Sequence, residues 1–149
     1  MSIEKAIKQK KFDNEYEKLL VNLLYTTGCI STAQNRVLKP FGISAQQYNV
    51  LRILRGQHPI SVSVGLVAER MLDQNSNASR LIDKLTQKGY INRTVCKYDR
   101  RQKEVVISAE GLKALREMDK KMNQFQKQFE TISVDEARKM NELLDQMRK

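Results

Sequence analysis

The chain has 149 residues, of which 40% are hydrophobic and 30% charged, and its formal net charge is +10. That length favours a single domain whose core needs no disulfides, and the two cysteines and one histidine form no pattern typical of a zinc or catalytic site. There is no apolar run of about 18 residues, so we expect a cytoplasmic protein that does not enter a membrane. Because no metal-binding or catalytic pattern is present, we also expect that it is not an enzyme and holds no metal or cofactor. The positive net charge predicts that it binds a polyanion.

Two helices are predicted in the first third of the chain. Apolar side chains recur at three- and four-residue steps over about 10–38, and Pro40 is expected to stop that helix. Ser44 and Gln47 form a capping-box pattern that opens a second helix over about 44–55.

The next two helices are separated by a polar turn. Ser63 can cap a short helix over about 64–72, with Leu72 on its buried side. An amphipathic helix follows over about 76–88, and Gly89 is its expected left-handed stop. Its inner face is apolar, whereas its outer face holds Ser79, Arg80, Asp83 and Lys84.

A basic hairpin comes after this helix. Strand-like runs at 90–96 and 105–107 flank a polar turn at 97–103, which is too long for a two-residue hairpin loop. Eight Lys or Arg and three Asp lie between residues 73 and 103, so half of the net charge is concentrated in about a fifth of the chain. This charge favours nucleic acid as the polyanion.

The last part of the chain is predicted to be helical again. Ser108 caps a helix over about 109–131, and Ser133 with Glu136 forms a capping box for a final helix. The helices at both ends have long stripes of Phe, Tyr, Leu and Met that the middle of the chain is too small to cover. We therefore expect a homodimer whose interface uses both ends of the chain.

The helix at 76–88 and the hairpin together suit double-stranded DNA. The major groove admits one α-helix, in which Asn can pair with adenine and Arg with guanine. An arginine at a hairpin tip can enter the minor groove, and Asp99 could orient a neighbouring guanidinium. Ser76 and Asn77 could equally be only a helix cap. The candidate DNA-binding residues are Ser76, Asn77, Ser79, Arg80, Lys84, Arg93, Asp99, Arg100, Arg101 and Lys103.

Short segments over about residues 40–115 follow one another in a characteristic order. They are Phe41-Gly42-Ile43-Ser44, Gln47-Tyr48, Val50-Leu51, Leu66-Val67-Ala68-Glu69-Arg70, Ser79-Arg80-Leu81-Ile82-Asp83-Lys84-Leu85, Lys88-Gly89-Tyr90-Ile91, Asp99-Arg100-Arg101 and Ile107-Ser108-Ala109-Glu110-Gly111. This series resembles the multiple-antibiotic-resistance regulator (MarR) family of winged helix-turn-helix proteins. The resemblance implies a mainly α fold with a small β-wing (α+β), and an obligate dimer on a pseudo-palindromic operator. It also implies repression of transcription that a small aromatic or lipophilic ligand relieves.

The resemblance assigns roles to parts of the chain. It implies a single MarR-like domain over 1–149, with a winged-helix lobe at about 40–108 and dimerisation helices at about 5–38 and 109–149. It matches Ser79 and Arg80 to recognition-helix positions, and Arg101 with Asp99 to the wing. Effector pockets of such proteins lie between the dimer helices and the DNA-binding lobe, which here points to Tyr16, Tyr25 and Tyr48; these tyrosines could equally be interface packing.

Two alternatives remain open at the level of sequence. A winged helix can serve as a protein- or RNA-interaction module without operator specificity. A thiol-based, redox-responsive regulator is the other, but Cys29 lies well beyond the sensing position of the oxidation-sensing branch of the family, and Cys96 is expected to face the core.

Overall fold

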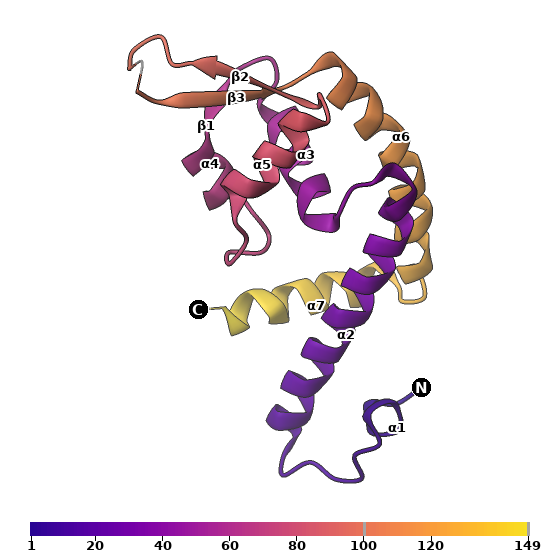
Figure 1. The fold of residues 1–149 in the computed structure, drawn as a ribbon. Helices are drawn as coiled ribbons and strands as arrows, with labels where there is room; N and C mark the ends of the chain where they lie inside the picture. The colour runs from indigo at the N-terminus through magenta and orange to yellow at the C-terminus, as the bar shows by residue number, and fades with distance from the viewer. Residues whose placement is uncertain (100, 149) are drawn as a thin grey trace. The chain divides into compact units, whose positions relative to one another are not determined.

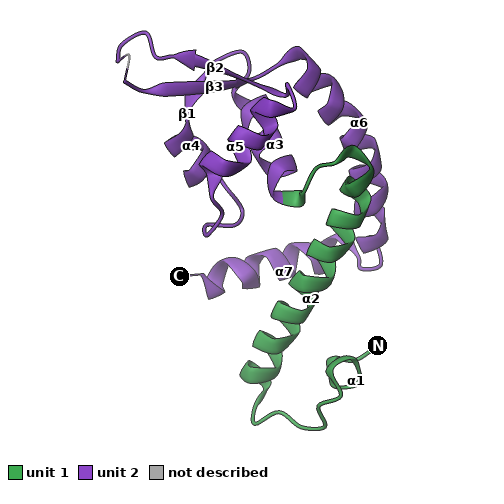
Figure 2. Cartoon of the chain, viewed as in Figure 1, with its two compact units in different colours: residues 1–45 green, residues 46–149 purple. Residues whose placement is uncertain are grey.

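The computed structural model describes residues 1–99 and 101–148, and the chain divides into two compact units, residues 1–45 and 46–149 (Figure 2). The fold is mainly helical with a three-stranded antiparallel sheet (Figure 1). Within the described residues, no helix combines the length and apolarity that crossing a bilayer would require.

The first unit holds two α-helices, α1 (Ile3–Ile7) and α2 (Glu15–Leu38), and the 3-10 turn η1 (Lys39–Phe41). The expectation of one helix from about residue 10 was wrong at its start. Asn14 is extended, and its side-chain oxygen accepts hydrogen bonds from the N–H groups of Tyr16 and Glu17, each over 2.9 Å. This cap satisfies amides that have no partner within the helix, so α2 begins at Glu15.

The second unit contains the helices α4 (Val64–Glu69) and α5 (Ala78–Gln87), and most of α3 (Ala45–Gln57). Ser63 caps α4 as expected, because its Oγ accepts from the Leu66 N–H over 3.1 Å. The helix is shorter than the expected 64–72. Met71 is buried, while Leu72, which was expected to be buried, is 87% exposed.

The sheet has the order β1-β3-β2, with β1 (Val62–Ser63), β2 (Ile91–Val95) and β3 (Lys103–Ile107) all antiparallel. The two longer strands were expected, whereas β1 was not, since two residues are too few to show an alternating pattern. The strands β2 and β3 form a hairpin, here called the wing, in which Ile91 is opposite Ile107 and Arg93 is opposite Val105. Directly opposed side chains share one face of a sheet, as do residues two apart on a strand, so Arg93 is on the same face as these buried apolar residues.

The C-terminal part consists of α6 (Ala109–Gln126), the 3-10 turn η2 (Lys127–Phe129) and α7 (Val134–Met147). Ser108 caps α6, and the expected capping box between Ser133 and Glu136 is present at the start of α7.

The core of the second unit lies between α3, α4, α5, α6 and one face of the sheet (Figure 1). Its most deeply buried side chains are Val50, Leu51, Leu54, Val67, Ile82, Leu85, Ile91, Val105, Leu115 and Met118. The burial of residues from all of these elements fixes α5 and the wing as parts of one packed body.

Candidate nucleic-acid interface

The N-terminus of α5 is formed by Asn77, whose Oδ1 accepts a hydrogen bond from the Arg80 N–H over 3.0 Å. Ser76 lies one residue earlier, and its hydroxyl donates to the carbonyl of Asp73. The helix therefore begins at Ala78, two residues later than expected. Both Ser76 and Asn77 help to form the turn and the cap, and direct contact of either with DNA remains a prediction.

Two side chains of α3 form hydrogen bonds to the turn that leads into α5. Gln46 Nε2 donates to Asp73 Oδ2 over 2.7 Å, and Asn49 Oδ1 accepts from the Leu72 N–H over 2.9 Å. Asp73 Oδ1 also accepts from the N–H of Asn75, as is typical of an Asx-turn. These supporting residues were not among the sequence candidates, although the polar run at 73–75 was a signal for the turn.

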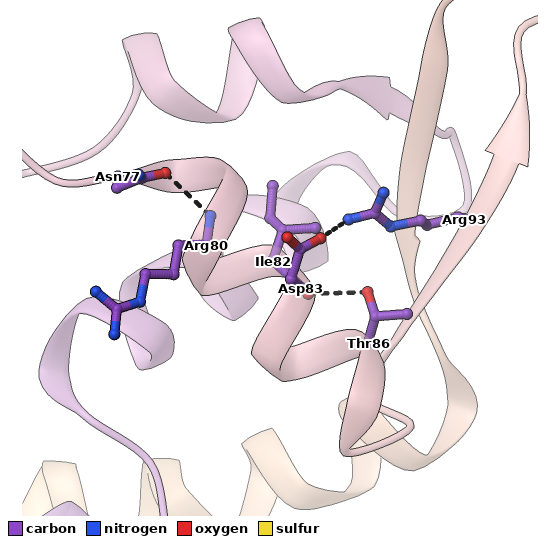
Figure 3. A network of polar contacts seen from close by, with 6 residues as sticks. All are labelled: Asn77, Arg80, Ile82, Asp83, Thr86 and Arg93. Carbon is purple, nitrogen blue, oxygen red and sulfur yellow. Dashed lines mark hydrogen bonds and ion pairs between the residues drawn. The ribbon is translucent and has the colours of Figure 1, made fainter.

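The outer face of α5 presents Ser79, Arg80 and Lys84 to solvent, while Ile82 and Leu85 are buried. In Figure 3 the guanidinium of Arg80 extends away from the helix and away from Asp83. Among the described residues, no hydrogen bond or ion pair engages the Arg80 guanidinium. It is therefore available to an external acceptor.

Asp83, on the same helix, forms an ion pair with Arg93 of β2 (Figure 3). The Arg93 side chain is 35% exposed and that of Asp83 57% exposed. The sequence analysis predicts that Arg93 contacts DNA, but its guanidinium already has an intramolecular partner. The missed signal is the two-residue period of the strand, which aligns Arg93 with buried Ile91.

The α5 helix ends at a glycine, Gly89, before the chain enters the wing. Gly89 has a φ of +77°, as expected, and its N–H donates to the Thr86 carbonyl over 2.9 Å. The N–H of Tyr90 donates to the Leu85 carbonyl over 3.0 Å. This pair of bonds is the Schellman motif, which ends α5 and starts β2 two residues after Gly89.

At the tip of the wing, Asp99 stabilises the turn through backbone contacts. Its Oδ1 accepts from the N–H of Arg101 over 2.9 Å, and its carbonyl accepts from the N–H of Gln102 over 3.0 Å. The carboxylate thus contacts the Arg101 backbone, where the sequence suggested a guanidinium. Arg101 and Lys103 are exposed, whereas Arg100 lies outside the described residues.

The three candidate effector tyrosines have different surroundings. Tyr16 and Tyr25 are on α2, where they are 84% and 40% exposed. Tyr25 helps to line an open groove of about 500 Å³ with Leu24, Gly28, Cys29, Thr32, Ala33 and Arg36. Tyr48 is buried in the other unit, its hydroxyl donates to Asp119 Oδ1 over 2.7 Å, and burial raises its pKa to about 12.

The two cysteines also differ. Cys29 is exposed on α2, and Cys96, which was expected to face the core, is buried directly after β2. Both are free thiols.

Comparisons with known proteins agree with this architecture. The MarR family model matches residues 43–103, which span α3 to the start of β3. The chain is 27% identical over 141 residues to the HTH-type transcriptional regulator PapX of Escherichia coli, covering 91% of this chain and 86% of PapX.

Two solved structures show the same fold. CouR from Rhodococcus jostii RHA1, bound to p-coumaroyl-CoA, has a TM-score of 0.74 and 22% identity over 91% of this chain and 95% of that chain. The organohalide-sensing regulator RdhR-CbdbA1625, in its 2,4-dichlorophenol-bound form, has a TM-score of 0.81 and 16% identity over 94% of this chain and 85% of that chain. Together with the sheet and the helices above, these comparisons show that residues 43–103 match the MarR family, that the chain is similar to HTH-type transcriptional regulators, and that its fold is that of MarR-family proteins.

Proposed function

We propose that the protein is a dimeric repressor that binds a pseudo-palindromic operator and leaves it when a small aromatic or lipophilic ligand binds. In each protomer, α5 enters the major groove and the wing reaches the adjacent minor groove. The twofold axis places the two α5 helices about 34 Å apart, one turn of B-form DNA.

The observation that supports this function best is the group of exposed cations on α5 and the wing. Arg80 and Lys84 are exposed on the helix, and Arg101 and Lys103 are exposed on the hairpin. The Asp83–Arg93 ion pair joins these two elements. Such a concentration of positive charge fits the phosphate backbone on both sides of a groove.

The residue assignments can be tested with DNA that the protein itself selects from a random-sequence pool. Arg80→Ala should reduce the preference for the selected duplex over a shuffled one, because the lost guanidinium reads a base edge. Lys103→Ala is the matched control: it should weaken binding to both duplexes equally, as expected for a phosphate contact. Equal effects of the two substitutions on both duplexes would reject Arg80 as the base-reading residue.

The dimer is supported by apolar side chains that remain exposed in the single chain. On α7, Val134, Met140, Leu143 and Met147 are 75%, 50%, 47% and 50% exposed. On α2, Leu20 and Leu24 are 56% and 66% exposed. Apolar surface of this kind marks an interaction site, and a second copy would cover it. Light scattering after size exclusion at micromolar concentration should give twice the mass of one chain, and a monomer would refute the dimer.

Repression itself needs a functional assay. A promoter with the selected site overlapping its polymerase-binding region should give less transcript when the purified protein is added. An increase in transcript would show an activator instead. The Arg80→Ala variant at the same concentration is the control for specific binding.

The ligand is the remaining part of the proposal. CouR and RdhR-CbdbA1625 were solved with an aromatic thioester and a chlorinated phenol, which suggests phenolic molecules as probes. Tyr16, Tyr25 and Tyr48 are the proposed contacts; Tyr48 has no hydroxyl proton to donate to a ligand, since it donates that proton to Asp119. A phenolic ligand should raise the melting temperature and release the DNA, and Tyr25→Ala should diminish both effects. Absence of stabilisation across a panel of phenols would contradict this assignment.

A further inference from the structure

Asp83 occupies an unfavourable position for a DNA-binding helix. It carries a negative charge on the outer side of α5, three residues after Arg80 and directly before Lys84. Residues three apart on a helix are neighbours on its surface, and a carboxylate and a guanidinium at that spacing form ion pairs. Left alone, Asp83 would compete with DNA for the Arg80 guanidinium.

The structure shows a different pairing. The Asp83 carboxylate accepts from Arg93 Nη2, and the Arg80 guanidinium points the other way (Figure 3). The sheet register explains how Arg93 reaches it. Arg93 is opposite Val105, on the face of β2 that also holds Ile91 and is packed against the helices. A guanidinium forms a strong charge-assisted bond with a carboxylate, so Asp83 is occupied from outside its own helix.

We propose that Arg93 is a positioning residue: by engaging Asp83, it prevents an Asp83–Arg80 pair and leaves the Arg80 guanidinium available for a base edge. The inference rests on the proposed role of Arg80 in operator recognition. It replaces the expectation that Arg93 contacts DNA itself. The two roles differ in one consequence: only a positioning role for Arg93 depends on the presence of Asp83.

A double-mutant cycle with Arg93→Gln and Asp83→Asn separates them. Gln keeps much of the aliphatic stem of Arg93 and removes its charge. The single Arg93→Gln variant should lose about tenfold or more in affinity for the selected duplex, the cost of a lost arginine–guanine pair. Adding Asp83→Asn should restore affinity to within about threefold of the original, because no carboxylate remains to capture Arg80.

The matched control uses Lys97, an exposed cation that follows β2. Lys97→Gln removes the same charge from the wing without touching Asp83. The effects of Lys97→Gln and Asp83→Asn on DNA affinity should be additive. Additivity would show that removing the negative charge of Asp83 does not by itself rescue the loss of any cation of the wing. The salt dependence gives a second readout. A lost phosphate contact lowers the log–log slope by about 0.9, whereas Arg93→Gln with Asp83→Asn should leave the slope close to its original value.

The outcomes are distinct. If Arg93→Gln with Asp83→Asn binds as weakly as Arg93→Gln alone and the slope falls in both, Arg93 is a phosphate contact and the inference is overturned. Melting temperatures show whether each variant is folded. If Arg93→Gln does not fold, Asp83→Asn decides by itself: unchanged or tighter binding supports the inference, and weaker binding overturns it. If the unsubstituted protein selects no duplex at all, the proposed operator recognition fails, and the inference fails with it.

Discussion

The hydroxyl of Tyr48 donates a hydrogen bond to Asp119 Oδ1 over 2.7 Å, and this contact joins α3 to α6. The other carboxylate oxygen of Asp119 forms an ion pair with Arg55, which is also on α3. A second arginine of α3, Arg52, has its guanidinium 5.9 Å from the centre of the Tyr48 ring. One carboxylate thus ties two residues of α3 to the long helix that follows the wing.

This contact predicts a particular alkaline sensitivity of the fold. The pKa of Tyr48 is raised from 10.0 to about 12, chiefly by burial and then by its bond to Asp119. Because the folded state holds the proton more tightly, the stabilisation is complete below pH 10 and is lost as the pH rises toward 12. Tyr48→Phe should lower the free energy of unfolding by about 1 kcal/mol at pH 8, the worth of one hydrogen bond.

Denaturant unfolding at pH 8 and pH 11 checks this. The difference in unfolding free energy between the unsubstituted protein and Tyr48→Phe should shrink at the higher pH. A difference that stays constant would show that the Tyr48 hydroxyl does not titrate as the structure implies.

A second prediction concerns Gly111, in the first turn of α6. A Cβ at this position would lie 2.2 Å from the Tyr90 carbonyl oxygen, which itself accepts from the Ser108 N–H over 2.9 Å. Gly111→Ala should therefore destabilise the fold by about 1–3 kcal/mol, because the backbone must move to relieve the overlap. Thermal or denaturant unfolding measures the change.

Gly56, near the end of α3, is the matched control. Nothing lies within 4 Å of a Cβ at that position. Gly56→Ala should be neutral or stabilise by up to about 1 kcal/mol, because alanine favours helix. Equal effects of the two substitutions would contradict the close approach of α6 to the end of α5.

The helices were largely predictable because their local signals are strong. Ser63, Ser108 and Ser133 cap the helices that the sequence placed after them, and Gly89 takes the left-handed conformation that ends α5. The start of α2 was missed, because the apolar spacing was taken to begin at about residue 10, before the cap at Asn14.

The candidate site was only partly predictable. The exposed residues of α5 follow from its helical period, but the partners that position them come from distant segments. Gln46 reaches Asp73, and Arg93 reaches Asp83, through packing that no local pattern encodes. The sequence singled out Asp99 but predicted the wrong kind of contact for it: its carboxylate accepts from the backbone N–H of Arg101 and not from a guanidinium. A carboxylate can accept from either kind of donor.

Asn77 has a cap role that the structure shows and a DNA contact that remains predicted, and two substitutions distinguish them. Asn77→Ala should lower stability by about 1 kcal/mol, because it removes the acceptor for the Arg80 N–H. Asn77→Ser should keep the cap and the melting temperature, yet reduce preference for the selected duplex, because serine cannot form the bidentate pair that asparagine makes with adenine. If Asn77→Ser selects DNA as the original protein does, Asn77 is a cap only.

Arg101 should behave as a contact residue with no part in the core. It is exposed at the wing tip, and its hydrogen bond to Asp99 is made by the backbone N–H. Arg101→Ala should therefore weaken binding to the selected duplex by about tenfold while the melting temperature stays within about 1 °C. A large fall in melting temperature would show instead that the side chain supports the fold of the wing.

Operator binding by α5 and the wing of both protomers is tested most directly by the salt dependence of affinity for the selected and the shuffled duplex. If each protomer neutralises about four phosphates, log K should fall with log salt concentration with a slope near −7. At about 0.15 M salt, the selected duplex should bind about 10³-fold more tightly than the shuffled one. A slope near zero, or equal affinity for the two duplexes, would contradict the account.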